Sequence, residues 1–487
     1  MWIEIGQTLC RVTNASSDEQ AWIQKYLSFE DTRWRGQRRG TRISLFSSVK
    51  GTFPGGLLPL VMDAAGRDGM KVELLDKRVQ RITPDPSADL SWLRDYQLDA
   101  VEACCRHKRG IIRSPTASGK GDMIVGVVKR LPGRWLFLVH RDNLVSQQGK
   151  RYARLTGAVP NEVVGGDALA WRMIKGLNLM TLQSLAAGLR ADKAAAKEAL
   201  SELDGIIVDE CHVAPADVYY SAIQSCPAEY RLGFSGTPLD RGDNRSLMAI
   251  ACLGKVIYSI KPQLLIERGY LAAPSITMVT VKQKSLVKFG PSLAARAAAY
   301  HDIYDELIMD SDVRNQAVVD LVKQAPKPCM VFVTKIEHGR TLVSALRQAQ
   351  VATEFVWGDK RKEAREAAVE RLERGDSACL VASVVFQEGV DIPSLASVVV
   401  ASGGKSVIAA LQRVGRGMRT DQGRKAEFAV FDVLDVGSPM LERHARRRMN
   451  TYVREGYQTT IRAEDGTPSP YQPKLKTRKE KRAGGKL

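Results

Sequence analysis

Short runs of branched apolar residues alternate with helix-forming segments along most of the chain. The runs that predict buried strands in the first half are residues 111–112, 135–139, 177–182, 205–208 and 231–234. The segments between them that predict helices include residues 98–105, 122–130 and 192–203. Strands that alternate with helices are typical of an open parallel sheet, whose ligands lie beyond the carboxyl ends of the strands. We therefore expect an α/β lobe with its functional residues at that edge.

The same pattern occurs again in the second half and, in a smaller form, before the first lobe. Residues 328–333, 378–382, 397–400 and 428–431 predict four more strands and a second α/β lobe. Residues 1–85 predict a small α/β module with strands at 2–5, 9–12, 43–46 and 71–75. A helix is predicted from Ser17 to Leu27, with its first three residues as the cap, and residues 57–65 form an amphipathic segment. Residues 83–87 have the Pro-rich composition of a linker.

A stretch of small residues between a predicted strand and a predicted helix indicates a phosphate-binding loop. It consists of Ser114, Pro115, Thr116, Ala117, Ser118, Gly119, Lys120 and Gly121. Such a turn brings backbone N–H groups together on an anion, the helix N-terminus adds positive potential, and Lys120 adds a full charge. Ser114 and Gly121 depart from the usual pattern, and Gly121 replaces the hydroxyl residue that ordinarily holds Mg²⁺. An ordinary polar turn is the alternative interpretation.

Two carboxylates follow a buried strand downstream and favour the phosphate-loop interpretation. Residues 205–208 are apolar, and Asp209, Glu210 and His212 come at the end of the run. In ATPases with such a loop, one acidic residue holds Mg²⁺ and a following Glu polarises the attacking water. Asp209 fits the first role and Glu210 the second. A strand whose polar end meets solvent is the alternative.

The charge of the chain predicts a polyanionic partner. The formal net charge is +18, the pI is about 9.5, and basic residues cluster at 33–42 and 474–486. In the first cluster, Trp34 beside Arg35, Arg38 and Arg39 can stack on a base or contact the sugar-phosphate backbone. A solvated hairpin is the equally weighted alternative. The second cluster predicts a flexible tail that binds phosphates non-specifically.

Composition gives no indication of a membrane or a disulfide framework. No run approaches the ~20 apolar residues of a membrane span. The N-terminus has no signal-peptide pattern, and the eight cysteines are scattered without C-x-x-C pairs. We therefore expect a cytoplasmic protein with reduced thiols.

The ordered set of motifs resembles the superfamily 2 helicases. The motifs are LRDYQ, PTASGKG, LVHR, VDECH, SGTP, EGVDIP and QRVGRGMR, and the resemblance covers about residues 90–455. The DECH box, the last motif and the stretch 444–452 look most like the XPB and phage UvsW-type DNA helicases. This resemblance implies two tandem RecA-like lobes that bind ATP and Mg²⁺, with nucleic acid across both. The implied domains are an accessory, DNA-binding module (1–85), an ATP-binding lobe (86–272), a second lobe (273–455) and a basic tail (456–487).

The resemblance also implies a role for each matching residue. Arg94 and Gln97 would recognise adenine, a role that the paired donor and acceptor of a Gln amide also suit. Gly119 and Lys120 would bind phosphates, with Asp209 on Mg²⁺ and Glu210 on water. Ser235, Gly236 and Thr237 would couple hydrolysis to lobe closure. Gly389 and Asp391 would line the lobe interface, Gln412 would help to orient the water, and Arg416 and Arg419 would be arginine fingers. His140, Arg141, Thr181 and Gln183 would face the phosphate backbone of the nucleic acid.

The function implied is an ATP-dependent DNA helicase or translocase that remodels branched or duplex DNA in replication, recombination or repair, in a phage or bacterial host. The implied partner is DNA, whether branched, duplex or single-stranded. An RNA helicase and a duplex translocase that never separates strands are alternatives. A nucleic-acid-binding scaffold with a decayed ATPase is the non-enzyme alternative, because Gly121 puts Mg²⁺ ligation by the loop in doubt. A water or Thr116 would compensate for the missing hydroxyl. If Asp209, phosphate and water already hold Mg²⁺, Gly121→Thr leaves turnover unchanged or raises it.

Overall fold

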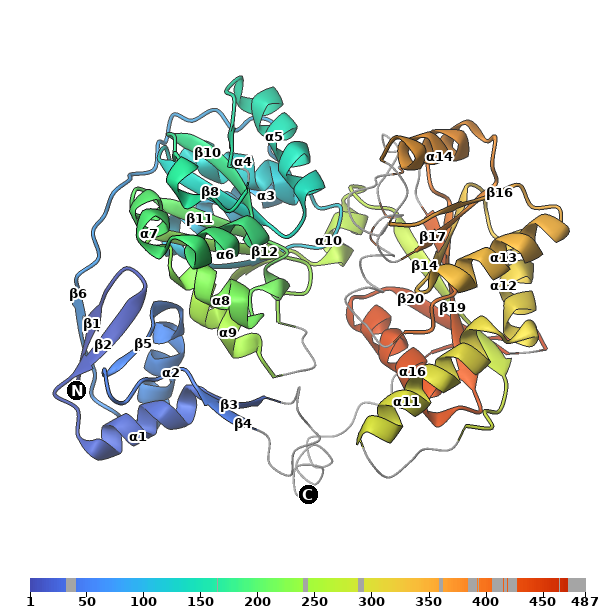
Figure 1. Ribbon diagram of the computed structural model, residues 1–487, viewed down its shortest axis with the longest axis horizontal. Helices are drawn as coiled ribbons and strands as arrows, with labels where there is room; N and C mark the ends of the chain where they lie inside the picture. The colour runs from blue at the N-terminus through green and yellow to red at the C-terminus, as the bar shows by residue number, and fades with distance from the viewer. Residues whose placement is uncertain are drawn as a thin grey trace. The chain divides into compact units, whose positions relative to one another are not determined.

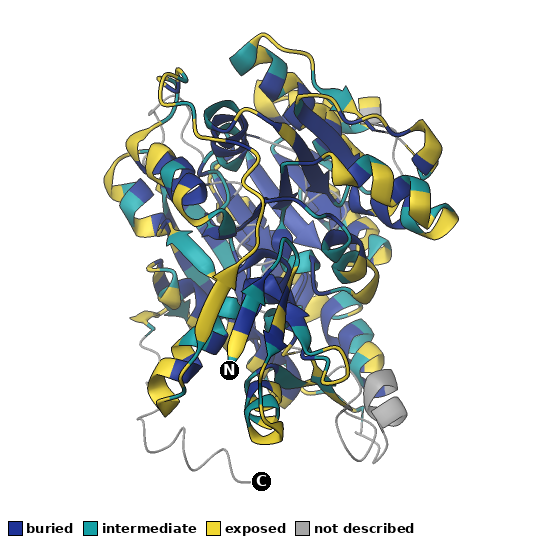
Figure 2. Cartoon of the chain, turned by 90° about the vertical axis from the view of Figure 1, so that its left-hand side faces the viewer, coloured by how far each residue is buried: buried dark blue, intermediate teal, exposed yellow. Residues whose placement is uncertain are grey.

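The computed structural model divides the chain into two compact units, Met1–Ile260 and Lys261–Leu487. It describes residues 1–31, 41–163, 165–239, 244–287, 293–358, 362–383, 392, 394–404, 415, 418, 427–463 and 465–471. Each unit is described by itself below. Figure 1 labels the elements, and Figure 2 shows that the central strands are buried whereas the helices carry exposed outer faces.

The N-terminal module of the first unit is built on a four-stranded sheet with the order β5-β2-β1-β6. Its elements are β1 (Trp2–Ile5), β2 (Leu9–Thr13), α1 (Ser17–Tyr26), β5 (Thr52–Pro54), the 3₁₀ turn η2 (Gly55–Leu57), α2 (Leu58–Asp68) and β6 (Glu73–Asp76), and a separate hairpin pairs β3 (Ser28–Asp31) with β4 (Thr41–Ser44). Strand β1 pairs antiparallel with β2 and parallel with β6. The N-cap of α1 is Ser16, which forms a capping box with Glu19, so the predicted cap at Ser17–Glu19 was one residue late.

The rest of the first unit is a seven-stranded parallel sheet with the order β13-β7-β12-β11-β8-β10-β9. The strands are β7 (Arg109–Arg113), β8 (Arg134–Val139), β9 (Asn161–Glu162), β10 (Gly176–Thr181), β11 (Gly205–Asp209), β12 (Tyr230–Ser235) and β13 (Val256–Ser259). The helices are α3 (Asp95–His107), α4 (Lys120–Arg130), α5 (Asp142–Thr156), α6 (Leu182–Ala191), α7 (Lys193–Ser201), α8 (Asp217–Gln224) and α9 (Ser246–Leu253), with short 3₁₀ turns η3 (Ala168–Ala170) and η4 (Cys211–Val213).

Helices cover both faces of this sheet (Figure 1). One face packs side chains such as Leu136, Leu138 and Ile206 against α6, α7 and α8. Helices α3, α4 and α5 contact one another and the other face. Because both faces are buried, the central strands are mostly apolar, and most of their polar residues lie at the strand ends; the buried Asn178 in β10 is an exception. This arrangement places the ends of β7, β11 and β12 side by side.

The second unit is built on an eight-stranded sheet with the order β16-β17-β15-β18-β19-β14-β20-β21. The strands are β14 (Ala273–Lys282), β15 (Cys329–Val333), β16 (Thr353–Val356), β17 (Cys379–Ser383), β18 (Ser397–Val400), β19 (Glu427–Val436), β20 (Gln458–Arg462) and β21 (Pro468–Pro470). The helices are α10 (Pro262–Glu267), α11 (Leu293–Tyr304), the π-helical η5 (Asp305–Met309), α12 (Asp312–Gln324), α13 (Ile336–Gln348), α14 (Lys362–Arg374) and α16 (Pro439–Arg454). All the pairings are parallel except that of β20 with β21.

The two parallel-sheet lobes and the small N-terminal α/β module confirm the predicted fold class. The sheets are larger than predicted, because β9, β13, β14, β16, β20 and β21 were not expected. The predicted helix at 192–203 is α7, and Asp192 is its N-cap rather than its first turn. The predicted tail at 474–486 lies outside the described residues.

Candidate nucleotide site

The predicted phosphate loop connects β7 to α4 in a conformation that needs small residues. Ala117 and Gly119 have φ angles of 67° and 78°, in the left-handed region. A Cβ on Gly119 would lie 2.2 Å from Gln97 Nε2, so glycine is required there. The Ser118 hydroxyl donates to Pro115 O at 2.6 Å and also hydrogen-bonds the Ser114 hydroxyl. The two serines therefore fold the loop on itself and leave its backbone to meet an anion.

Helix α3 fixes this loop from outside. Tyr96 Oη and Gln97 Nε2 both donate to Ser118 O at 3.0 Å. Gln97 Oε1 accepts from the backbone N–H of Arg94 at 2.9 Å. Both polar groups of the Gln97 amide are thus engaged within the chain, beside the loop. Adenine recognition by Arg94 and Gln97 stays a prediction, and the structure adds a role for Gln97 as a brace.

The end of β11 brings the predicted carboxylates to the loop. Lys120 Nζ lies 3.3 Å from Glu210 Oε1, and these side chains are 14% and 18% exposed, so solvent still reaches the pair. Glu210 has a φ of 45°, and its backbone N–H donates to Asp209 Oδ1 at 2.9 Å. A left-handed glutamate is a strained conformation of the kind found at functional sites. The turn points Glu210 across to the N-terminus of α4.

The other oxygen of Glu210 is held by two polar side chains. Glu210 Oε2 lies 3.2 Å from His212 Nδ1 and accepts from the Ser235 hydroxyl at 3.3 Å. Ser235 Oγ also accepts from Thr237 N at 3.2 Å. This network connects the ends of β11 and β12 to the acidic residue. The sequence motif contained His212, but no role was predicted for it; its signal was its position two residues after Glu210.

The charged groups of this site shift one another's pKa values. Although burial opposes it, Lys120 and His212 hold the pKa of Glu210 well below its usual range. Burial and the Glu210 charge raise the pKa of Asp209 to about 6. Burial lowers the pKa of Lys120, but Glu210 and Asp209 outweigh it and raise the pKa overall. Glu210 is thus kept ionised, while Asp209 gains a proton more readily than an ordinary aspartate.

The raised pKa of Asp209 predicts a pH-dependent stability. Its ionised form is disfavoured in the Mg²⁺-free fold. The contribution of protonated Asp209 to the free energy of unfolding is therefore fully present below pH 3.8 and is lost as the pH rises through about 6. Relative to Asp209→Asn, the wild type should lose unfolding free energy across this range. Added Mg²⁺ should restore it, because the metal binds the carboxylate. Thermal unfolding of both proteins at several pH values, with EDTA or with Mg²⁺, measures this; parallel pH curves for the two proteins would contradict it.

The residues around Asp209 fit a nucleotide-bound Mg²⁺ better than a metal held by protein alone. Among the residues that the structure describes, no group of three or more His, Cys, Asp or Glu side chains is arranged to hold a metal ion. Mg²⁺ commonly binds through one or two carboxylates, phosphate oxygens and water. Asp209 beside an anion-binding loop supplies that donor set.

The structure changes the expectation for Gly121. A Cβ on Gly121 would lie 1.9 Å from Arg151 Nη1 and 2.7 Å from Gln148 Oε1. Gln148 Nε2 donates to Gly121 O at 3.0 Å, and Arg151 Nε lies 3.1 Å from Asp122 Oδ1. Helix α5 therefore places a guanidinium where a side chain at position 121 would go. The sequence did not reveal this contact, which joins residues thirty positions apart.

We now expect Gly121→Thr to lower turnover rather than leave it unchanged or raise it. The threonine must displace the ends of the Arg151 and Gln148 side chains, and this breaks the hydrogen bond from Gln148 Nε2 to Gly121 O at the start of α4. Gly121→Thr combined with Arg151→Ala should recover part of the loss, because it makes room for the threonine. Steady-state ATP hydrolysis by the two variants and by Arg151→Ala alone tests this; full activity of Gly121→Thr by itself would contradict it.

The candidate nucleic-acid residues of the first lobe gather at the ends of β8 and β10. Gln183 Nε2 donates to His140 O at 2.9 Å, which joins the two segments. The Thr181 hydroxyl caps α6 by accepting from Ser184 N at 3.1 Å. Arg141 is the N-cap residue of α5. The structure thus brings the four residues together and gives Gln183 and Thr181 local structural contacts; their contact with phosphates stays a prediction.

Other predicted site residues lie outside the described residues. They are Trp34, Arg35, Arg38 and Arg39 in the N-terminal module, and Gly389, Asp391, Gln412, Arg416 and Arg419 in the second lobe.

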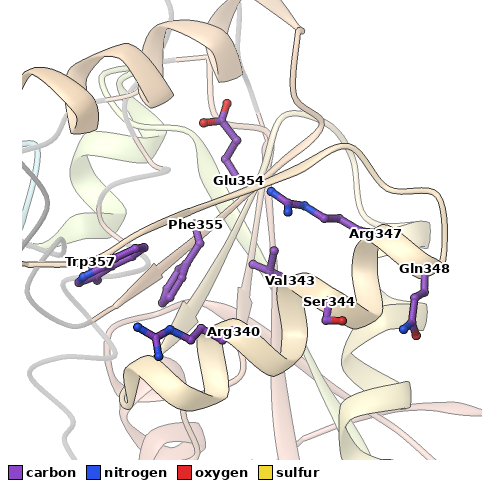
Figure 3. Close-up of a pocket in the computed structure, with 8 residues that line it drawn as sticks. All are labelled: Arg340, Val343, Ser344, Arg347, Gln348, Glu354, Phe355 and Trp357. Atoms are coloured by element: carbon purple, nitrogen blue, oxygen red, sulfur yellow. The ribbon is translucent and has the colours of Figure 1, made fainter.

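A cavity of about 640 Å³ lies in the second unit, between α13 and the edge strand β16 (Figure 3). Phe355 and Trp357 lie side by side there, with ring centroids 4.9 Å apart. Arg347 donates to Thr353 O and so supports the start of β16. None of its lining residues is a predicted site residue.

Within the described part of the chain, no helix is both long and apolar enough to cross a membrane.

Two family models match the chain. Residues 91–240 match "Type III restriction enzyme, res subunit", and residues 313–421 match "Helicase conserved C-terminal domain". The first match contains the phosphate loop, Asp209, Glu210 and Ser235. The second begins before β15 and includes Gln412, Arg416 and Arg419.

Several named proteins are similar to this chain. The DNA 3'-5' translocase XPB2 of Sulfurisphaera tokodaii is 25% identical over 73% of this chain and 84% of its own length. The ATP-dependent DNA helicase uvsW of Enterobacteria phage T4 is 25% identical over 70% of this chain and 68% of its own length. A helicase-named protein of Sulfolobus islandicus filamentous virus is 25% identical over 70% of this chain, but the match spans only 64% of that protein.

The fold is also similar to a solved structure. The ATP-dependent Type ISP restriction-modification enzyme LlaBIII bound to DNA superposes with a TM-score of 0.56 at 16% identity. The match covers 81% of this chain and 32% of LlaBIII. At this level of identity the likeness concerns the fold.

Proposed function

We propose that this chain, which belongs to the superfamily 2 helicases and is similar to the XPB and UvsW types, is an ATP-dependent DNA helicase or translocase that remodels branched or duplex DNA in replication, recombination or repair. The observation that carries the proposal is the contact between Lys120 and Glu210 at the end of the small-residue loop 114–121. The phage relative supports a phage or bacterial host as the setting.

In this proposal the first lobe binds ATP through the loop 114–121. The loop backbone and Lys120 hold the phosphates, and Asp209 holds Mg²⁺, which neutralises charge on the phosphates when it is bound. Glu210 orients and polarises water, and its ionised state suits that role. Arg94 and Gln97 remain the candidates for adenine. In the second lobe, Gly389, Asp391, Gln412, Arg416 and Arg419 remain candidates on the strength of their motifs.

Ser235 is proposed to couple the nucleotide state to the strand edge. Its hydroxyl bridges the Glu210 carboxylate and the backbone of Thr237, and Gly236 packs on the loop, where a Cβ would lie 3.4 Å from Ser114 O. A change in the contacts of Glu210 therefore reaches the 235–237 segment directly. The paired ends of β8 and β10, with His140, Arg141, Thr181 and Gln183, are the proposed contact for the nucleic-acid backbone.

Strand displacement and triplex displacement assays test the proposal. We expect ATP-dependent separation of forked DNA by a DNA helicase. Displacement of a third strand without strand separation would favour the duplex translocase, and separation of RNA but not DNA would favour the RNA helicase. Glu210→Gln is the matched control. ATP-independent activity, or none on any substrate, would contradict the proposal.

The N-terminal arginines are expected to set substrate preference. Replacing Arg35, Arg38 and Arg39 by Ala should reduce the preference for forked or duplex DNA over single strands and leave basal ATP hydrolysis intact. Deletion of residues 474–487 is the comparison, and it should lower affinity for all nucleic acids alike. On duplex DNA, each lost phosphate contact should also flatten the slope of log affinity against log salt concentration by about 0.9. Binding to forked, duplex and single-stranded DNA across a salt series distinguishes the two; equal weakening on all three substrates by the triple replacement would rule out substrate selection.

A further inference from the structure

A cavity of about 130 Å³ lies where the N-terminal module packs on the first lobe. The module contributes residues that include Gly55, Gly56 and Arg78, and the lobe contributes residues that include Arg109 and Lys255. Arg109 begins β7, and Lys255 directly precedes β13. The cavity is therefore at the amino ends of the strands, whereas Lys120 and Glu210 lie at their carboxyl ends. It is separate from the candidate nucleotide site.

Arg109 brings an uncompensated charge to this cavity. Its three guanidinium nitrogens are each buried and have no hydrogen-bond partner among the described residues, although the side chain as a whole keeps some exposed surface. Arg231, a fully buried guanidinium of the same lobe, behaves differently: it donates to Cys252 O and Ile223 O, both at 2.9 Å. A buried cation without partners costs several kcal/mol. Such a group indicates a ligand that supplies the missing acceptors.

The neighbouring charges add to that of Arg109. Burial, then Arg231 and Arg78, lower the pKa of Arg109 to about 9, and Cys10 acts in the opposite direction. Arg78 is held by Asp76, with Nε 2.9 Å from Oδ1. Lys255 and His107 are exposed at the rim. Two carboxylates act on Arg78, and both are already engaged: Asp76 with Arg78 itself, and Glu229 with Lys108 Nζ at 2.7 Å.

The backbone of the module is shaped around the guanidinium. A Cβ on Gly55 would lie 2.7 Å from Arg109 Nη1, so glycine allows the close approach. Helix α2 begins at Leu58 with no acidic residue in its first turn and no side-chain cap, and Leu58 and Pro59 line the cavity. The Leu58 N–H already donates to Gly55 O and Pro59 has no N–H, so the helix contributes positive potential there and not a direct hydrogen bond from these two residues.

We propose that this cavity binds one phosphate group, which bridges Arg109 of the first lobe to the start of α2 in the N-terminal module. Ligand pockets for nucleotide-sized molecules span roughly 300–1,000 Å³, so 130 Å³ suits a single small oxyanion. A phosphate carries the negative charge that the start of α2 favours and the several acceptor oxygens that Arg109 and Lys255 require. Its source is either free phosphate or the terminal phosphate of a nucleic-acid strand.

Thermal unfolding of the full chain tests the proposal. In phosphate-free buffer at constant ionic strength, added inorganic phosphate should raise the Tm of the wild type in a saturable way that matched chloride does not reproduce. Arg109→Met should abolish this site's share of the rise, and without phosphate it should be at least as stable as the wild type because the buried charge is gone. It leaves the loop 114–121 intact, so the difference between the two titrations reports this cavity. Arg106→Met, which removes an exposed arginine nearby, is the matched control.

Two further measurements complete the test. If Arg109→Met does not fold, Lys255→Ala replaces it and should require several-fold more phosphate for half of the rise. Oligonucleotides with and without a 5′-phosphate separate the sources: a larger rise with the phosphorylated strand, lost in the variant, assigns a strand terminus, and equal rises assign free phosphate. A wild type with no phosphate-specific rise, or a rise that Arg109→Met or its substitute retains in full, would overturn the proposal.

Discussion

Glu210→Gln is expected to lower ATP turnover by about 10²–10⁴-fold while the fold and nucleotide binding are retained. Glutamine has the shape of glutamate and keeps an oxygen that Ser235 can donate to. It cannot carry the charge that Lys120 and His212 stabilise, and it cannot take up a proton from water. The loss should therefore appear in kcat at saturating Mg-ATP and DNA.

The neighbouring His212 provides the matched control for this substitution. His212→Ala removes one contact of Glu210 Oε2 but leaves its charge and its pairing with Lys120. It should lower turnover less than Glu210→Gln does. A folded Glu210→Gln protein with near-normal kcat would show that Glu210 is a structural partner of Lys120 and has no catalytic role.

Lys120→Ala is expected to lower both nucleotide affinity and turnover, with a combined loss in kcat/KM of at least ~10²-fold. The substitution removes the one full positive charge of the loop 114–121. It also leaves Glu210 without its ion-pair partner in a site that is mostly buried, so the variant should be less stable than the wild type without nucleotide. Nucleotide binding, steady-state kinetics and thermal unfolding measure these effects.

Lys129→Ala on the same helix is the control. Lys129 lies in the last turn of α4, with its Nζ 4.8 Å from the centroid of the Trp92 ring, far along the helix from the loop. It should leave both kinetic parameters unchanged. Equal effects of the two substitutions would mean that Lys120 contributes only to the helix.

The sequence predicted the central strands of both lobes because they are buried on both faces and therefore continuously apolar. Edge elements gave weaker signals. Strand β9 has only the two residues Asn161 and Glu162, and β13 pairs with β7 through a register irregularity. Strand β14 lies inside its sheet, between β19 and β20, but it mixes Ser and Thr with its apolar residues, so its ten residues lack a continuous apolar run. Such strands are defined by their neighbours in the sheet and not by their own composition.

The candidate site was predictable as far as strand ends determine it. Asp209 and Ser235 end β11 and β12, Glu210 follows β11, and Lys120 lies after the loop that follows β7, so adjacent parallel strands bring the four residues together. Contacts from helices were not predictable, because nothing in the local sequence says which helix faces lie opposite. The brace from Tyr96 to Ser118 and the approach of Arg151 to Gly121 are both of this kind. The second contact reversed the expected effect of Gly121→Thr.

The rate of ATP hydrolysis with different nucleic acids tests the central claim most directly. It should be measured for the wild type and for Glu210→Gln with no nucleic acid and with single-stranded, duplex and forked DNA and RNA, at one salt concentration. A DNA-dependent ATPase predicts that DNA stimulates hydrolysis by the wild type, that RNA stimulates it less, and that Glu210→Gln abolishes the stimulated rate. Hydrolysis that no nucleic acid changes, or that is absent in a wild type that still binds DNA, would contradict the account and favour a nucleic-acid-binding scaffold.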